Sequence, residues 1–191
     1  MIDRGTREVI RELYVGRWGE PSRCAEFRRD SRTVEIYKWD PQQTDEGLVL
    51  YATLGGSERP VGPLSPEHRV ELFTRLLPEE DQIAQYLSML LLSSEPENPH
   101  LLDGHTVNYL EPIWEGTEVS GFLILEPRVE LIPQLQIDDV HVDFLQVIPL
   151  LPSELIFRAK YGVEELLALW EKGEVPFWSM RRGPVPGSTA T

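Results

Sequence analysis

The feature that most constrains the fold is a strand-like segment that runs directly into a helix-like one over residues 140–170. The segment begins with alternating apolar and polar residues, which indicates a strand with one buried face. Residues 145–151 are apolar on both faces apart from one glutamine, so this strand should enter the core as it proceeds. Pro152 then supplies a typical helix start, and apolar side chains recur at helical spacing before Gly173.

Other parts of the chain alternate strand-like runs with two further helical patterns. One helix is predicted over residues 6–18, where apolar residues share a face, and another follows Pro78 with acidic residues at its start. Strand-like patterns fall at residues 33–39, 47–54, 68–76 and 117–125. Runs of strands with inserted helices are typical of the α+β class. We therefore predict a mixed, mainly antiparallel β-sheet with helices packed against it.

The length of 191 residues corresponds to about one domain, which we expect to span residues 1–178. Residues 179–191 are rich in Pro, Gly, Ser and Thr and carry little to bury, so we predict a disordered tail. Phe177 and Trp178 precede this tail. We expect them to pack against the first helix, and the alternative is an exposed binding anchor.

The chain is acidic, because 32 acidic residues outnumber 18 basic ones and leave a formal net charge of −14. Nucleic acids are bound by clustered Lys and Arg, which this sequence lacks beyond short pairs, so we expect no nucleic-acid partner. An acidic surface can instead steer a basic protein partner, or it can simply keep the protein soluble.

A single cysteine, Cys24, excludes an intrachain disulfide and a multi-thiolate zinc site. The longest apolar run, residues 87–92, is too short to cross a bilayer, and the first residues lack the apolar core of a signal peptide. We expect a soluble cytoplasmic protein without membrane contact.

The residues nearest to a catalytic set are Asp139, His141 and Asp143, which share one face of the strand predicted around them. Two neighbours on this face could chelate an ion, but three would be strained, so His105 or Asp103 on a second strand would have to complete a divalent-metal site. Such a site would support a metal-dependent hydrolase. The alternative is a solvated strand face that contributes charge to a protein interface.

Motifs for other kinds of chemistry do not occur in the sequence. The Gly-Gly-Ser at residues 55–57 lacks the second glycine of a nucleophile elbow, and there is no phosphate-binding glycine loop. We therefore expect no enzymatic activity and no cofactor.

Four short segments occur in a fixed order along the chain. They are LYATLGGS at residues 50–57, RVELFTRL at 69–76, GHT at 104–106, and FLQVIPL at 144–150 with Glu154 following. Together they resemble the suppressor-of-fused family, over roughly residues 30–172. The resemblance implies a binding module without catalysis. Bacterial members resemble immunity proteins that neutralise a toxin, and animal members hold a transcription factor in the cytoplasm.

The resemblance also implies a binding region, because in animal members a partner peptide adds as a strand near the segment that matches Gly104, His105 and Thr106. This chain has His105 where those members have Asp, and Ser93 where they have Tyr, so we do not expect the same ligand. We predict a bacterial-type immunity protein that binds a basic toxin domain. The predicted contact residues are Gly104, His105, Thr106, Asp139, His141 and Asp143.

Overall fold

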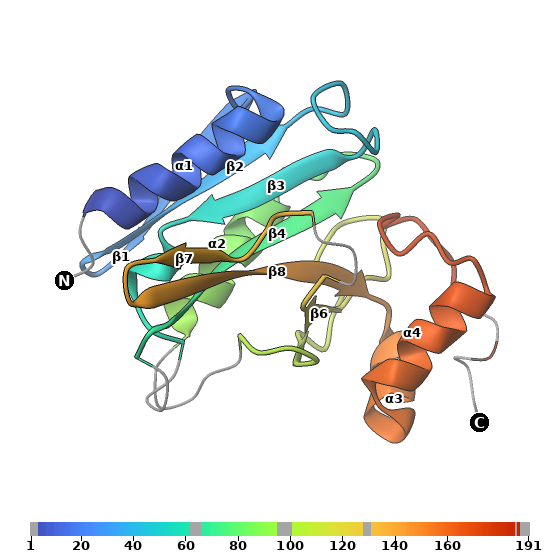
Figure 1. Ribbon diagram of the computed structural model, residues 1–191. Coiled ribbons are helices and arrows are strands. Elements are labelled where there is room, and N and C mark those ends of the chain that lie inside the picture. Colours follow the sequence, from blue (N-terminus) through green and yellow to red (C-terminus); the bar gives the residue numbers. More distant parts are fainter. Residues whose placement is uncertain (1–3, 62–65, 95–100, 128–130, 186, 188–191) are drawn as a thin grey trace.

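The computed structural model describes residues 4–61, 66–94, 101–127, 131–185 and 187 (Figure 1). Within these residues, eight strands form one sheet. The strands are β1 (Arg23–Arg29), β2 (Arg32–Trp39), β3 (Val49–Leu54), β4 (His68–Leu76), β5 (Thr106–Asn108), β6 (Gly121–Leu125), β7 (Leu135–Ile137) and β8 (Val140–Leu150). The helices are α1 (Arg4–Trp18), α2 (Ile83–Ser93), α3 (Pro152–Tyr161) and α4 (Val163–Lys172), with a short 3-10 helix η1 (Gly56–Glu58).

The sheet is mixed and mainly antiparallel, as the sequence predicts. Its order is β1-β2-β3-β4-β8-β6-β5, and β7 pairs with the first residues of β8. The described pairs are antiparallel except β4 with β8, which run parallel in the middle of the sheet. This parallel pair places His68 directly beside His141.

Strand β8 is the central strand that the alternating and then apolar pattern predicts. It is half-buried where it starts and fully buried along its second half, where β6 pairs with it. Pro152 begins α3 shortly after the strand ends. The single helix expected there is two helices, because Gly162 adopts a φ of +94° and interrupts the helix between α3 and α4.

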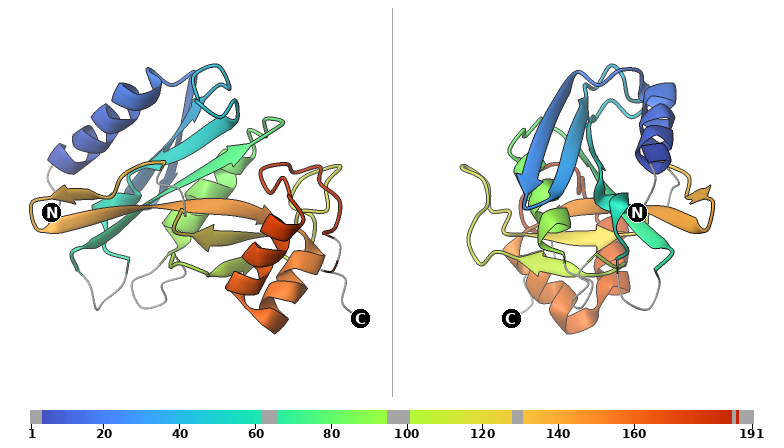
Figure 2. Two further views of the ribbon diagram at one scale, coloured as in Figure 1. Left: turned by 45° about the vertical axis from the view of Figure 1, so that its right-hand side comes forward. Right: turned by 90° about the vertical axis from the view of Figure 1, so that its left-hand side faces the viewer.

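Helices cover both faces of the sheet, with α1 and α2 on opposite sides (Figure 2). Helix α1 packs Ile10, Tyr14 and Trp18 against Trp39 and Phe144. Helix α2 packs its leucines against alternate residues of β2, β4 and β8 on the other face. Helices α3 and α4 lie together at the end of the sheet away from α1 (Figure 1). None of these described helices combines the length and apolar character that crossing a membrane requires.

The edge strand β1 is not predicted by the sequence pattern. Its residues, Arg23–Arg29, are mostly charged and mostly exposed, so they show no apolar alternation. The strand forms because Asp30 adopts a φ of 55° and turns the chain back along β2. Pairing with β2, rather than burial of a face, therefore defines this edge.

The chain after α4 packs on the core, which corrects the tail predicted to be disordered from residue 179. Met180, Arg182 and Val185 are all buried. The prediction is therefore wrong up to Val185, and the folded domain extends past residue 178. Residues 186 and 188–191 lie outside the described part of the chain.

Candidate functional site

The divalent-metal site that His105 would complete, which the sequence left open as an alternative, does not form. His105 lies just before β5, and its carbonyl accepts a hydrogen bond from Ile124 of β6. Strand β6 separates β5 from β8, and Ile124 pairs with Val147, about 20 Å along β8 from His141. Asp139 lies in the exposed turn between β7 and β8. His105 and Asp139 therefore do not converge on His141.

A different group of three residues gathers where β4 and β8 begin. His68 pairs with His141 across the two strands, and Asp143 follows on the same face of β8. The Nδ1 of His68 lies 2.8 Å from the Nε2 of His141, and the Nε2 of His68 lies 3.3 Å from an oxygen of Asp143. All three side chains are half-buried. Two residues named from the sequence thus meet a third, His68, that was not expected to join them.

The Gly104-His105-Thr106 segment lies at an edge of the sheet. Gly104 adopts a φ of +76°, and its carbonyl accepts a 2.6 Å hydrogen bond from Arg158 of α3. Thr106 begins β5, which pairs with β6 on one side and ends the strand order on the other. Asp103 faces this end of the sheet too, since its carboxylate accepts a hydrogen bond from the Glu126 amide. The segment is thus an edge to which a further strand could add.

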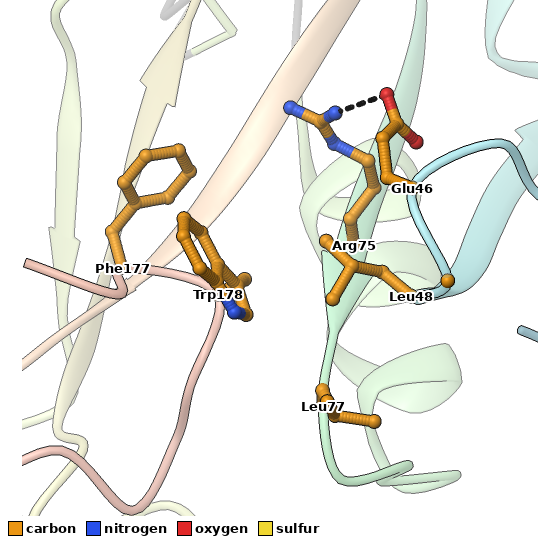
Figure 3. A pocket seen from close by; sticks show the side chains of 7 residues that line it. Glu46, Leu48, Arg75, Leu77, Phe177 and Trp178 are labelled. Atoms are coloured by element: carbon orange, nitrogen blue, oxygen red, sulfur yellow. Dashed lines mark hydrogen bonds and ion pairs between the residues drawn. The ribbon is translucent and has the colours of Figure 1, made fainter.

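Apolar side chains near the end of α4 line a groove with two hollows, one of which is shown in Figure 3. That hollow is about 420 Å³ and is lined by Glu46, Gly47, Leu48, Arg75, Leu77, Phe177 and Trp178. The second hollow is about 440 Å³, lies against α4 and the segment after it, and shares Phe177 and Trp178. We call the two hollows together the aromatic groove. Trp178 borders Leu48 and Leu77 rather than α1, so the packing expected from the sequence is wrong.

Backbone and ring contacts hold the aromatic groove in shape. The Leu77 amide donates a 3.2 Å hydrogen bond to the Trp178 carbonyl, which ties the last segment to the end of β4. Phe177 stacks on Trp170 with ring centroids 5.8 Å apart, and it meets Trp178 edge-on at 5.2 Å. Leu77 is 45% exposed. The groove therefore presents apolar surface on side chains that already have packing partners.

The rim of the aromatic groove is acidic. Glu171 and Glu174 are exposed beside one hollow, and Glu46 is exposed beside the other. Arg75 also lines the groove, but its Nη1 lies 2.8 Å from a carboxylate oxygen of Glu46, so that pair is close to neutral. The remaining rim charge is negative, in keeping with the net charge of the chain.

A second charged cluster joins β2 to the turn before α2. Lys38, whose side chain is 6% exposed, places its Nζ 2.8 Å from a Glu79 oxygen and 2.7 Å from an Asp81 oxygen. The Tyr51 hydroxyl donates to the same Asp81 oxygen over 3.0 Å. Burial alone would raise the pKa of Asp81, but the hydrogen bonds from Lys38 and Tyr51 outweigh burial and lower that pKa. The cluster is an internally paired network, with a structural role.

Replacing Asp81 by asparagine is expected to lower the free energy of unfolding by about 1 kcal/mol at neutral pH, a modest value because the carboxylate is partly exposed to water. A depressed pKa stabilises the fold above the unfolded value of 3.8 and stops doing so as pH falls through the folded value. The gap between wild type and D81N, measured by urea unfolding, should therefore close as the pH falls below 3.8. Asp45→Asn, at an exposed carboxylate, is the control. A gap that stays constant with pH would contradict the expectation.

Solved structures of other proteins share the fold. A SUFU (suppressor of fused protein) homologue from Neisseria gonorrhoeae FA 1090 aligns with a TM-score of 0.73 at 19% identity, over 96% of this chain and 98% of that one. A chain of the Sufu-Fu complex gives 0.62 at 12% identity, over 95% and 91%. Drosophila Suppressor of Fused gives 0.55 at 13% identity, over 80% and 42%. At these identities the likeness establishes the α+β fold.

The family assignment rests on the amino-acid sequence and not on the structural likeness. No curated protein matches it. The family described as Suppressor of fused protein (SUFU) matches residues 30–183, which is most of the chain and includes all four segments that carry the resemblance. The resemblance is confirmed, and the chain belongs to the suppressor of fused protein (SUFU) family.

Proposed function

We propose that this chain is a protein-binding module of the suppressor-of-fused type, which acts by occupying a partner and not by catalysis. The aromatic groove carries the proposal, because it holds partly exposed aromatic and aliphatic side chains in fixed positions. A few such residues supply most of the binding energy in protein interfaces. The solved complex of Sufu with Fu supports a binding role for this fold.

The partner we propose is a basic protein. Glu171 and Glu174 stand beside the aromatic groove, and the whole chain carries a net charge of −14. A partner that places an apolar side chain between Trp178 and Leu77, with Lys or Arg toward the rim, would match both the shape and the charge. Opposite charges speed the encounter of two proteins, and the effect weakens with salt.

The biological role we propose is immunity, in which this chain neutralises a toxin inside the cytoplasm. The resemblance to bacterial members of the family supports it. The test is growth of cells that express the protein encoded by the neighbouring gene, with and without this chain. Toxicity that this chain relieves is the expected result. Toxicity that persists during co-expression would contradict the immunity role.

Replacing Trp178 by alanine is expected to raise the dissociation constant for that protein at least about 10-fold, because the side chain forms the wall shared by the two hollows. Titration calorimetry measures the constant, and thermal unfolding checks that the variant is folded. Leu110→Ala is the matched control, since Leu110 is 85% exposed and does not line the groove. Equal affinities of W178A and wild type would exclude the groove as the contact.

The edge at Gly104, His105 and Thr106 is the second candidate contact. In an antiparallel pair, alternate residues turn their backbone groups away from the neighbouring strand, and the hydrogen bond from Tyr109 to Ser120 places Thr106 in that set. Thr106→Pro would remove the outward N–H that an added strand needs. If T106P weakens binding and W178A does not, the contact lies at this edge.

A further inference from the structure

We propose that His68, His141 and Asp143 bind one Zn²⁺ ion. Among the described residues these three offer ligand atoms that all lie within 4.8 Å of one another. They come from two neighbouring strands whose register sets His68 against His141, with Asp143 on the same face. The proposal is independent of the protein-binding role, because the aromatic groove contains none of the three residues.

The spacing of the ligand atoms suits a tetrahedral ion. Zinc binds imidazole nitrogen and carboxylate oxygen at about 2.0–2.2 Å, which places two tetrahedral ligand atoms about 3.4 Å apart. His68 binds an ion through one nitrogen only: its Nδ1 lies 2.8 Å from His141 and its Nε2 lies 3.3 Å from Asp143, and with one atom taken from each residue all three lie within 4.8 Å of one another. The backbone on both sides is fixed by strand pairing. Side-chain rotations that bring the longest of these separations toward about 3.4 Å would place the three atoms around one ion.

The chemistry of the three residues selects zinc over the hard cations. Two imidazoles and one carboxylate favour Zn²⁺, whereas Mg²⁺ and Ca²⁺ prefer oxygen ligands alone. Three protein ligands leave the fourth tetrahedral position open. All three side chains are half-buried, and Asp143 also lines a hollow of about 310 Å³, so the ligand atoms can be reached from solvent.

A neighbouring side chain orients the carboxylate. The amide of Gln134 donates a hydrogen bond to one oxygen of Asp143, while the other oxygen faces His68. Groups that hold a ligand in this way raise metal affinity by about 10- to 100-fold in known sites. Gln134 is thus a positioning residue, and replacing it leaves all three proposed zinc ligands in the chain.

The test is a zinc titration of the full chain, prepared without a histidine tag and stripped with chelator. Calorimetry should show one equivalent of Zn²⁺ per chain, the melting temperature should rise with added zinc, and Co²⁺ should give the visible absorption of a tetrahedral site. A chain that binds neither ion, with an unchanged melting temperature, would overturn the proposal. In that case the three residues form a hydrogen-bonded cluster only.

Variants locate the ion. His68→Gln and His141→Gln should each weaken zinc binding at least about 10-fold, because each removes one of three ligands, and Gln134→Ala should weaken it while keeping all three. His105→Gln and Asp139→Asn are the matched controls and should bind as wild type does. Equal losses in H105Q and H68Q would overturn the proposal. Melting temperatures measured without metal identify any variant that fails to fold. If the histidine variants do not fold, the zinc affinity of Q134A decides the test.

Discussion

Replacing Arg182 by alanine is expected to lower the free energy of unfolding by about 3–5 kcal/mol. The Arg182 guanidinium forms a buried pair with Glu154 of α3, with Nη2 2.7 Å from one carboxylate oxygen and Nε 3.2 Å from the other. Neither side chain is more than 2% exposed. Removing the arginine would leave a carboxylate in the interior without a counter-charge, and this situation accounts for the large expected effect.

Further hydrogen bonds of Glu154 and Arg182 show which parts of the fold depend on this ion pair. Glu154 also accepts hydrogen bonds from the Leu151 amide over 2.8 Å and from the Trp170 Nε1 over 3.0 Å, so it both caps α3 and fixes α4. The guanidinium donates to three backbone carbonyls, those of Pro149, Phe177 and Ser179. The pair therefore holds the last segment of the chain, α3 and the end of β8 in one arrangement.

Urea unfolding of the purified variants tests this expectation. The matched control is Arg181→Ala, because Arg181 is the neighbouring arginine and is exposed, and its change should stay within about 0.5 kcal/mol. The double variant E154Q/R182A should be more stable than R182A, since glutamine leaves no buried charge behind. An R182A protein as stable as R181A would show that the pair does not stabilise the fold.

The same pair explains why the end of the chain was predicted wrongly. Near Arg182 the apolar residues Met180 and Val185 stand singly among polar and small residues and show no apolar period, so the sequence alone indicates disorder. The partner, Glu154, is remote in sequence, and no local pattern reports a contact of this kind. In β8, by contrast, burial repeats along the strand, and the sequence pattern predicts both its location and its central place in the sheet.

The candidate sites, too, were predictable only where a local sequence pattern indicates them. His141 and Asp143 could be named from the strand pattern, whereas His68 could not be joined to them, because the parallel register of β4 and β8 is a tertiary feature. The aromatic groove was predictable in part. Trp178 stood out as an aromatic residue after the last helix, but Leu77 is a single apolar residue at the end of a strand and gives no signal by itself.

Replacing Glu71 by alanine is expected to lower the free energy of unfolding by about 4 kcal/mol. Glu71 lies in β4, is fully buried, and accepts five hydrogen bonds through its two oxygens. The donors are the Thr53 hydroxyl, the amides of Gly55, Gly56 and Ser57, and the Ser57 hydroxyl. Two of the four segments that carry the family resemblance thus meet at this carboxylate.

The expected loss is large because alanine would leave several buried donors without an acceptor, and each such group costs about 1–3 kcal/mol. The loop can aim its amides at Glu71 only with glycine, since a Cβ on Gly56 would lie 2.6 Å from the Val70 carbonyl oxygen. Glu71→Gln keeps one acceptor oxygen and should lose about half as much, which keeps the test decisive if E71A does not fold. The control is Glu118→Ala, at an exposed carboxylate. If E71A and E71Q have the same free energy of unfolding in urea as E118A, the loop at residues 55–57 does not depend on the Glu71 carboxylate.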